Sequence, residues 1–393
     1  MSGIIVCNST LKYLSMKIAI NAWFANMPTN GTGQYTHHLI NALRDVAPHV
    51  TIELVHPRHV PSGILGDLAK VRFEQVEFPN AAKRMGADIA FVPYWGPPLS
   101  CAVPVVCTVH DVISLAMPAY RGKIQHRIYS SLARAAAANA SAIITDSEFS
   151  KADILRLVMP VASQTAPPVT VVPLAAEARF TPAVPDADFE RARERYNLPN
   201  SYVLYLGGLD MRKNIETLLQ VYTWCGDSIG DEYPLVMNAL PGDRAIAADG
   251  SPTTLGEMLK ALELEDVVRL IGRVDEADKP ALYAGARCFL FASVYEGFGL
   301  PPLEAMSCGV PVVGSNATSL PEVVGNAGML VDALDARAMS GALIATCIED
   351  DLHDRLAQRA LMRAAQFSWQ RTALETLTVF KQVLAQNLKA QST

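Results

Sequence analysis

Short apolar runs alternate with longer helix-patterned segments along the chain, and the alternation starts afresh near the middle. Apolar runs of four to seven residues fit buried strands, whereas apolar residues three and four apart fit helices. Strands joined through helices favour a mostly parallel sheet covered on both faces. We expect strands in the first half at 17–21, 51–55, 88–92, 103–109, 142–145 and 169–173, and in the second half at 202–206, 234–237, 267–271, 288–292 and 310–314.

The length of 393 residues predicts roughly two domains, at about 100–200 residues each. The segment TPAVPD and a charged helix separate the two α/β series. We therefore expect one domain over 1–182, a second over 183–366 and a last helix over 367–393. A second possible start at Met16 would make residues 1–15 an extension. The carboxyl ends of the parallel strands predict a ligand cleft between the domains.

The composition excludes several classes of protein. Half of the residues are hydrophobic and 18% are charged, which is typical of a globular chain. A net charge of −6 gives no basic signal for nucleic acid. Seven cysteines without a CxxC pair indicate reduced, buried thiols. Because the sequence has neither an apolar run of about 18–20 residues nor signal-peptide features, we expect a cytoplasmic protein.

The motif EGFGLPPLE over 296–304 follows an expected strand. Gly297 and Gly299 let the backbone approach a ligand, and the prolines fit a helix start, whose free amides favour an anion. Glu296 on the loop and Glu304 in the first helical turn would be costly beside a phosphate unless they bind hydroxyl groups. Sugars and riboses supply such hydroxyls. The alternative is an ordinary turn with acidic caps.

A second loop, GGLDMRKN over 207–214, joins another expected strand to a helix. Arg212 and Lys213 suit a diphosphate, because guanidinium and ammonium groups make charge-assisted hydrogen bonds to phosphate oxygens. A pair of solvated surface charges is the alternative interpretation.

The first half contributes two further motifs. His110 and Asp111 end the expected strand over 103–109, where an α/β sheet holds its ligands. The loop NGTG over 30–33 is not a complete dinucleotide fingerprint, because Thr36 stands where the third glycine is needed. A structural histidine and a plain turn are the alternatives.

The segment YEGFGLPPLEAMSCGVPVV over 295–313 closely resembles the donor-site signature of family-4 retaining glycosyltransferases. That family has the GT-B fold, in which two Rossmann-like α/β domains face each other across a deep cleft. The resemblance extends from Met16 to the C-terminus and is tightest over 200–335. It implies that Glu296 contacts the transferred sugar and that Glu304 holds the ribose. The amides implied to meet the diphosphate or sugar belong to Phe298, Gly299 and Leu300.

The resemblance also assigns roles on the other loops. Lys213 matches the family's lysine, but many members carry an arginine where this chain has Gly208, and Arg212 is the candidate substitute. His110 would lie close to the transferred sugar and would act with Glu296, Lys213 and Arg212 in catalysis. The remaining implied contacts are Gly33, Gly208, Arg273 and Val274 for the donor, and Asp111 and Ser147 on the acceptor side.

The sequence predicts no metal site and no cofactor. His37 and His38 are adjacent, so they point in different directions on a helix. No DxD-like acidic pair follows a strand in the second half. The start of the last helix, FSW over 367–369, resembles a family helix that often returns to the first domain.

A basic amphipathic helix pattern lies near residue 125. Its basic residues are Arg121, Lys123, Arg127 and Arg134. Its apolar residues are Ile124, Ile128, Tyr129 and Leu132. Such helices bind anionic lipid surfaces. A core-facing helix with a solvated basic side is an equal alternative. We expect peripheral contact with an anionic membrane, at the inner face of the cytoplasmic membrane.

Together these features predict sugar transfer, with retention, from a GDP- or UDP-linked donor to a saccharide or lipid-linked saccharide. Nucleotide would bind the second domain and acceptor the first. The motif over 295–313, together with the RKN loop, most resembles those of bacterial mannosyltransferases and related enzymes, which implies GDP-mannose as the donor and a role in polysaccharide biosynthesis. The alternatives are a nucleotide-sugar epimerase or phosphorylase of the same architecture and a non-catalytic nucleotide-sugar-binding protein. The incomplete glycine fingerprint disfavours a dehydrogenase.

Overall fold

The structure, a computed structural model, describes residues 16–27, 31–60, 63–159, 166–246 and 251–392. The extension expected over 1–15 and Asn30 of the glycine loop lie outside the described residues. The chain divides into two compact units. The N-terminal unit comprises Met1–Leu174 with Ser368–Thr393, and the C-terminal unit comprises Ala175–Phe367.

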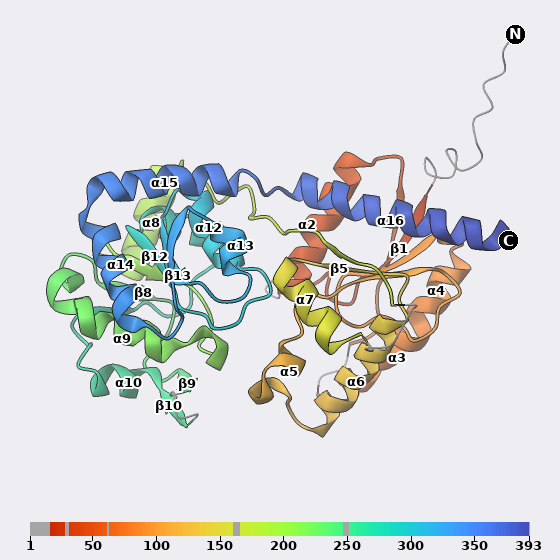
Figure 1. The fold of residues 1–393 in the computed structure, drawn as a ribbon, viewed down its shortest axis with the longest axis horizontal. Helices are drawn as coiled ribbons and strands as arrows, with labels where there is room; N and C mark the ends of the chain where they lie inside the picture. Colours follow the sequence, from red (N-terminus) through yellow and green to blue (C-terminus); the bar gives the residue numbers. More distant parts are fainter. Residues whose placement is uncertain (1–15, 28–30, 61–62, 160–165, 247–250, 393) are drawn as a thin grey trace, which may run out of the picture. The chain divides into compact units, whose positions relative to one another are not determined.

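A six-stranded sheet forms the centre of the N-terminal unit, with the order β2-β1-β3-β4-β5-β6 (Figure 1). All neighbouring strands are parallel. The strands are β1 (Lys17–Asn21), β2 (Thr51–Val55), β3 (Ile89–Val92), β4 (Val105–Thr108), β5 (Ala142–Thr145) and β6 (Val169–Val171). Strands β3, β4 and β5 are buried at every residue, as expected for strands covered on both faces.

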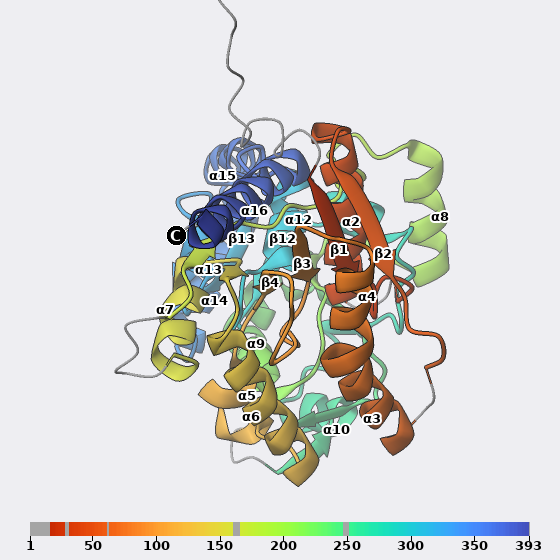
Figure 2. The ribbon, with the colours of Figure 1, turned by 90° about the vertical axis from the view of Figure 1, so that its right-hand side faces the viewer.

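Helices cover this sheet (Figures 1 and 2). They are α2 (Gly31–Val46), α3 (Ile64–Arg72), the π-helical η1 (Phe73–Glu77), α4 (Phe78–Arg84), α5 (Ile113–Ala116), the short 3₁₀ turn η2 (Pro118–Tyr120), α6 (Ile124–Ala138), α7 (Glu148–Leu157) and α16 (Trp369–Ser392). Helix α2 begins at Gly31, so the prediction of a loop extending to Gly33 was wrong. The predicted face of α2 is confirmed, because Tyr35, Leu39 and Leu43 are buried.

The last helix packs in the N-terminal unit, beside α2 (Figure 1). Trp369 stacks on His38 of α2 with ring centroids 5.1 Å apart. The fully buried Phe380 meets Phe91 of β3 at 5.1 Å. The hydroxyl of Thr372 donates to the carbonyl of Pro173 at 2.7 Å. The last helix therefore shares one core with residues that precede it by 199 to 331 positions.

The C-terminal unit repeats the architecture with a sheet of order β11-β8-β7-β12-β13-β14, also parallel. Its strands are β7 (Val203–Tyr205), β8 (Leu235–Met237), β11 (Val268–Leu270), β12 (Cys288–Phe291), β13 (Val312–Ser315) and β14 (Gly328–Val331). A separate antiparallel pair joins β9 (Arg244–Ile246) and β10 (Pro252–Thr254). Strands β9, β10 and β14 were not predicted.

Helices surround this second sheet (Figure 1). They are α8 (Asp186–Tyr196), η3 (Met211–Lys213), α9 (Ile215–Cys225), η4 (Gly226–Gly230), α10 (Leu255–Ala261), α11 (Lys279–Ala284), α12 (Leu300–Ser307), α13 (Leu320–Val324), α14 (Ala336–Ile348) and α15 (Asp350–Ala364). In the part of the chain that the structure describes, no helix is both long enough and apolar enough to span a membrane. The six cysteines described all have free thiols, and only Cys101 is not fully buried.

Candidate active site

The loop between β12 and α12 carries the motif with two glutamates. Gly299 has a φ of +117°, a backbone conformation that favours glycine, and a Cβ there would lie 2.9 Å from Leu320. The hydroxyl of Ser319 contacts the carbonyl oxygens of Glu296 and Phe298 at 3.0 and 2.7 Å. The amide of Glu296 donates to the hydroxyl of Thr318 at 3.0 Å. The loop is therefore held in place from the β13–α13 connection.

The second predicted loop follows β7 and is tied to the first. The side chain of Asn214, in left-handed backbone conformation, donates to the carbonyls of Ala292 and Ala333 at 3.1 and 2.7 Å. The amide of Val294 donates to the carbonyl of Arg212 at 2.8 Å. Because β7 and β12 are parallel neighbours, both loops leave the same edge of the sheet.

Three charged side chains meet between these loops. Glu296 accepts from Lys213 Nζ at 2.6 Å through Oε1 and from Arg212 Nη1 at 2.7 Å through Oε2. Lys213 and Glu296 are buried, and Lys213 Nζ lies 4.9 Å from the centre of the Phe291 ring. Burial lowers the pKa of Lys213, although Glu296 opposes this shift. Arg212 also pairs with Asp210 at 3.1 Å. The structure thus brings together Arg212, Lys213 and Glu296, as the sequence predicted.

Glu304 occupies a different position. It is the fifth residue of α12, so its predicted place in the first helical turn was wrong. The hydroxyl of Tyr283 donates to Glu304 Oε2 at 2.9 Å. Burial raises the pKa of Glu304 to about 7, with partial opposition from Lys279 and Tyr283. This carboxyl group changes its charge near neutral pH.

The remaining donor-side positions carry fewer contacts. Gly208 is exposed, and its carbonyl accepts from the hydroxyl of Tyr205 at 2.5 Å. Arg273 is exposed and Val274 half-buried, after β11 at the same sheet edge. Among the described residues, no hydrogen bond or ion pair joins Arg273 to the Arg212–Glu296 cluster. The contacts of Gly208, Arg273 and Val274 do not by themselves indicate a role for these residues.

The N-terminal unit holds its own polar cluster, built on the neighbouring strands β4 and β5. His110 follows β4, and its Nδ1 lies 2.7 Å from Oδ2 of the buried Asp146, which follows β5. Tyr35 presents its ring edge-on to the imidazole at 4.6 Å, and its hydroxyl lies 3.0 Å from Thr108 Oγ1. Within the described residues, His110 Nε2 has no hydrogen-bond partner. The ring is therefore held at Nδ1, while Nε2 is buried without a hydrogen bond to a described residue.

Electrostatics at His110 follow from this arrangement. Burial by itself lowers the pKa of the imidazole, but the charge and hydrogen bond of Asp146 outweigh it. Asp111 and the carbonyl of Pro93 contribute in the same direction, so the pKa of His110 is raised. A positively charged imidazole is therefore favoured beside Asp146.

Three other predicted positions in this unit have local structural roles. Asp111 Oδ1 accepts from the amide of Ile113, which opens α5, at 3.0 Å. Ser147 is buried and caps α7 by accepting from the amide of Ser150 at 3.0 Å. Gly33 is buried, and a Cβ there would overlap the carbonyl of Met27. Glycine is therefore required at position 33, in the first turn of α2, by its close packing against the carbonyl of Met27, whatever its role toward a ligand.

Sequence reasoning missed Asp146, Thr318 and Ser319. The available signal for Asp146 was the TDS triplet at the end of an expected strand, one strand along from His110. The bracing by Thr318 and Ser319 had no comparable signal, because these residues lie on a different connection from the loop that they hold.

Comparisons with known proteins agree over both units. Residues 186–363 match the family model described as Glycosyl transferases group 1, and residues 29–173 match Glycosyltransferase Family 4. The chain is 36% identical over 277 residues to the O-antigen chain mannosyltransferase B of Escherichia coli, covering 70% of each protein. It is 33% identical to the Escherichia coli serotype-specific mannosyltransferase WbdA, over 51% of this chain and 24% of that protein.

Solved structures share the fold. Sucrose-phosphate synthase from Thermosynechococcus elongatus has a TM-score of 0.69 at 21% identity, covering 94% of this chain and 99% of that one. WaaG, a glycosyltransferase involved in lipopolysaccharide biosynthesis, has a TM-score of 0.69 at 16% identity, covering 92% and 99%. Anabaena HepE, solved with UDP and glucose, has a TM-score of 0.65 at 20% identity, covering 95% and 99%.

Two parallel α/β units with these neighbours define the GT-B fold, which confirms the predicted architecture of two Rossmann-like domains. The chain belongs to glycosyltransferase family 4, as its motifs predicted. It is therefore an enzyme that transfers a sugar from a nucleotide-sugar donor to an acceptor.

Proposed function

We propose that the enzyme transfers mannose from GDP-mannose to a saccharide on a lipid carrier, with retention at the anomeric carbon and without a metal ion. The single observation that carries the donor-site assignment is the Glu296 carboxylate held by both Arg212 and Lys213. The choice of mannose rests on the similarity to the O-antigen chain mannosyltransferase B and WbdA of Escherichia coli. UDP-sugars are the alternative donors.

When the donor binds, Arg212 and Lys213 exchange the Glu296 carboxylate for the diphosphate as their partner. A diphosphate offers Arg212 and Lys213 more negative charge than one carboxylate, so it competes with Glu296 for them. Glu296, released from one or both contacts, accepts hydrogen bonds from sugar hydroxyls. As the bond to the sugar breaks, charge grows on the departing diphosphate, where Arg212 and Lys213 stabilise it. These two residues also supply the positive charge that a divalent cation would otherwise bring.

The start of α12 completes the donor site. Residues at a helix N-terminus have amides without intrahelical partners, and the helix dipole favours anions there. Leu300 begins α12, and Gly299 precedes it. We assign the amides of Phe298, Gly299 and Leu300 to the diphosphate or sugar. Glu304, one turn further along, binds the ribose hydroxyls in its ionised form.

His110 is assigned to the transferred sugar. Its Nε2–H donates to a sugar hydroxyl, while Asp146 holds Nδ1 and fixes the ring orientation. We nominate no protein nucleophile. The acceptor hydroxyl attacks on the face from which the diphosphate leaves, and its proton passes to a diphosphate oxygen.

Helix α6 supports peripheral membrane contact. Ile124 and Ile128 are 70% and 65% exposed, so the core-facing alternative is wrong for this end of α6. On α3, which contacts α6 through Lys70 and Tyr129, Leu65 and Leu68 are also exposed. Exposed apolar residues beside Lys and Arg are the combination that anionic lipid surfaces bind.

The test is a donor panel with the purified protein. Calorimetry with GDP-mannose, GDP-fucose, UDP-glucose and UDP-galactose should give the tightest binding for GDP-mannose, with slow release of GDP and unchanged activity in EDTA. NMR of the product should show the donor's anomeric configuration. Preference for a UDP-sugar would overturn the donor assignment. An altered free nucleotide sugar would indicate an epimerase, and binding without turnover on any acceptor would indicate a non-catalytic protein.

A further inference from the structure

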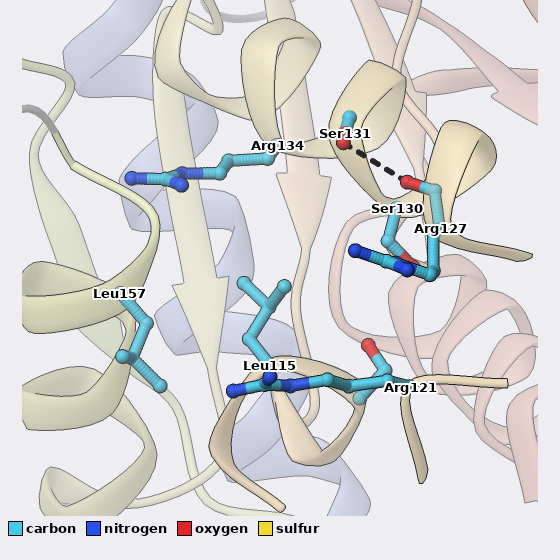
Figure 3. A pocket seen from close by; sticks show the side chains of 8 residues that line it. Leu115, Arg121, Arg127, Ser130, Ser131, Arg134 and Leu157 are labelled. Atoms are coloured by element: carbon cyan, nitrogen blue, oxygen red, sulfur yellow. Dashed lines mark hydrogen bonds between the residues drawn. The ribbon is translucent and has the colours of Figure 1, made fainter. Parts of the chain in front are cut away.

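A cavity of about 280 Å³ lies in the N-terminal unit, apart from the cluster at His110 (Figure 3). Helix α6 forms one wall, and the α5–η2 segment and the end of α7 form the others. Its polar lining consists of Arg121, Arg127, Arg134, Ser114, Ser130 and Ser131. In Figure 3, Arg134 lies above Leu115, Arg127 to its right and Arg121 below it, with Leu157 at the left. We call this site the arginine pocket.

The described part of the chain supplies no carboxylate that neutralises the arginine pocket. Between Asp111 and Asp146 the sequence has four Lys and Arg residues and no Asp or Glu, although the whole chain carries −6. Among the described residues, no carboxylate forms an ion pair with Arg121, Arg127 or Arg134. Arg134 donates only to the carbonyl of Val158, at 3.4 Å.

The acidic residues on the neighbouring helix α7 do not neutralise the arginine pocket, because they pair with cations of their own helix. On α7, Glu148 pairs with Lys151 at 3.2 Å and Asp153 pairs with Arg156 at 2.5 Å. Three like charges around one cavity repel one another, so a site of this kind gains free energy when an anion enters. The alternative, a set of independently solvated side chains, does not explain why all three line the same cavity.

The chemistry of the lining favours phosphate. A guanidinium group presents a planar fork of donors that matches a phosphate group, and serine hydroxyls add further donors. A volume of 280 Å³ lies just below the range of about 300–1,000 Å³ that is typical of sites for drug-sized ligands. The arginine pocket therefore has room for a phosphate or diphosphate group, but not for a complete nucleotide sugar.

The chain places the arginine pocket near His110. Ser114 follows His110 by four residues, and an extended chain advances at most about 3.6 Å per residue, so their Cα atoms are within roughly 14 Å. Asp111 fixes the start of α5 between them. On the other side, Arg127 stands beside the exposed Ile128 on α6. A ligand with its phosphate in the arginine pocket has a sugar site on one side and an apolar surface on the other.

We propose that the arginine pocket binds the phosphate group of an amphipathic phosphate ester. Two sources share this chemistry: the diphosphate that links a saccharide acceptor to its lipid, and the headgroup of an anionic phospholipid. The first source rests on the lipid-linked acceptor of the proposed function, whereas the second does not.

The experiment compares two double variants of equal charge. Arg121→Gln/Arg127→Gln removes two pocket arginines that have no side-chain partner among the described residues. Arg44→Gln/Arg84→Gln removes two exposed arginines of the same unit, on α2 and α4. Unchanged thermal unfolding and donor binding in both variants show that the fold is intact.

Co-sedimentation with phosphatidylcholine vesicles containing phosphatidylglycerol is the first readout. The wild type and the Arg44/Arg84 variant should bind, and the Arg121/Arg127 variant should bind at least about tenfold more weakly, because charge-assisted hydrogen bonds are lost. Pyrophosphate should displace the wild type at concentrations where chloride of equal ionic strength does not. Equal vesicle binding by all three proteins, or displacement by chloride alone, would exclude the phospholipid headgroup, and an unchanged KM for a lipid-diphosphate-linked acceptor as well would overturn the proposal.

Transfer assays then separate the two sources. A KM raised about tenfold for a lipid-diphosphate-linked acceptor, but unchanged for a soluble saccharide, supports the acceptor diphosphate. Weaker vesicle binding with both KM values unchanged supports the phospholipid headgroup. If the wild type transfers no sugar from any donor, the proposed function fails, yet vesicle binding still decides whether the arginine pocket binds phosphate.

Discussion

Lys213 and Glu296 are buried against each other with Nζ 2.6 Å from Oε1, although they are 83 residues apart in the sequence. Removing two charges from water costs free energy that their mutual attraction only partly offsets, so a buried ion pair is weak support for a role in stability. Arg212 contacts the second oxygen of Glu296 and also pairs with Asp210, so two cations and two carboxylates balance one another in the free enzyme. Two cations held together at the ends of parallel strands suit a diphosphate, which can replace the carboxylates as their partner.

Glu296→Gln and Lys213→Ala should each abolish most transfer. Glutamine keeps the shape of Glu296 but loses the charge that holds the two cations, and Lys213→Ala removes one donor to the leaving diphosphate. We expect kcat to fall by about 10²–10³-fold for Lys213→Ala, as when one donor to a developing negative charge is removed. Steady-state kinetics with the donor identified by the panel measure this effect.

The matched control for Glu296→Gln is Glu265→Gln, an exposed glutamate of the same unit. It should leave transfer and donor binding unchanged. Circular dichroism should show that all three variants remain folded. Near-normal turnover by both Glu296→Gln and Lys213→Ala would refute the donor-site assignment.

Asp146→Asn should lower the pKa of His110. Burial opposes the charged imidazole, and Asp146 supplies the largest attraction that reverses this effect. Asparagine still accepts a hydrogen bond from Nδ1, so the ring keeps its orientation while the charge is lost. Transfer should fall roughly tenfold to a hundredfold, the equivalent of one charge-assisted hydrogen bond. Histidine NMR titration of the free enzyme measures the pKa directly.

The same change has a predictable effect on stability. Because the folded-state pKa of His110 is raised, its contribution to stability is complete below about 6.5 and is lost as pH rises through the folded-state value. The difference in free energy of unfolding between the wild type and Asp146→Asn should therefore decrease as pH rises from about 6.5 through the folded-state pKa of His110. Asp111→Asn should shift the pKa of His110 less than Asp146→Asn does. An equal shift in both variants, or an upward shift in Asp146→Asn, contradicts the assignment of Asp146 as the positioning residue.

Local patterns predicted most of the fold. The strands β1, β2 and β5 were located to the residue. In β1 and β5 the buried residues form a mostly apolar run, whereas the partly buried β2 has polar Thr51 and Glu53 between apolar residues. The start of α2 was misplaced because Asn-Gly is typical of turns, and glycine is a poor helix former. The pair β9–β10 was missed because three-residue, partly exposed strands carry little pattern.

In the candidate site too, residues within one motif could be predicted, whereas contacts between distant segments could not. Glu296 and Lys213 stand in contiguous motifs, so their chemistry could be predicted from residue types and spacing. Asp146 could not be paired with His110 without knowing that β4 and β5 are neighbours in the sheet. The contact of Ser319 with the Glu296 loop depends likewise on the packing of two connections, which no local spacing specifies.

Glu304 should make both stability and donor binding depend on pH. Its folded-state pKa of about 7 lies above the ordinary value of 4.5. The protonated form therefore contributes stability that is complete below about 4.5 and is lost as pH rises through about 7. Ribose hydroxyls prefer the ionised form, so donor affinity should rise across the same upper range. Urea unfolding and calorimetry at pH 5, 6, 7 and 8 measure the two trends.

Glu304→Gln should flatten both pH trends, because the amide does not titrate. Relative to the wild type, its donor affinity should fall roughly tenfold or more at pH 8 and less at pH 6. A variant that retains the wild-type pH dependence of unfolding and of donor affinity would show that another group is responsible.

Phe380→Ala should destabilise the N-terminal unit and leave donor binding to the C-terminal unit intact. Phe380 is fully buried on α16 and meets Phe91 of β3, so its removal leaves a cavity in the core that costs about 3–5 kcal/mol. Leu374→Ala is the control on the same helix, because Leu374 is 51% exposed and its removal should cost well under half as much. Urea unfolding measures both values. Equal destabilisation by the two changes, or loss of donor binding in Phe380→Ala under native conditions, would contradict the assignment of α16 to the N-terminal core.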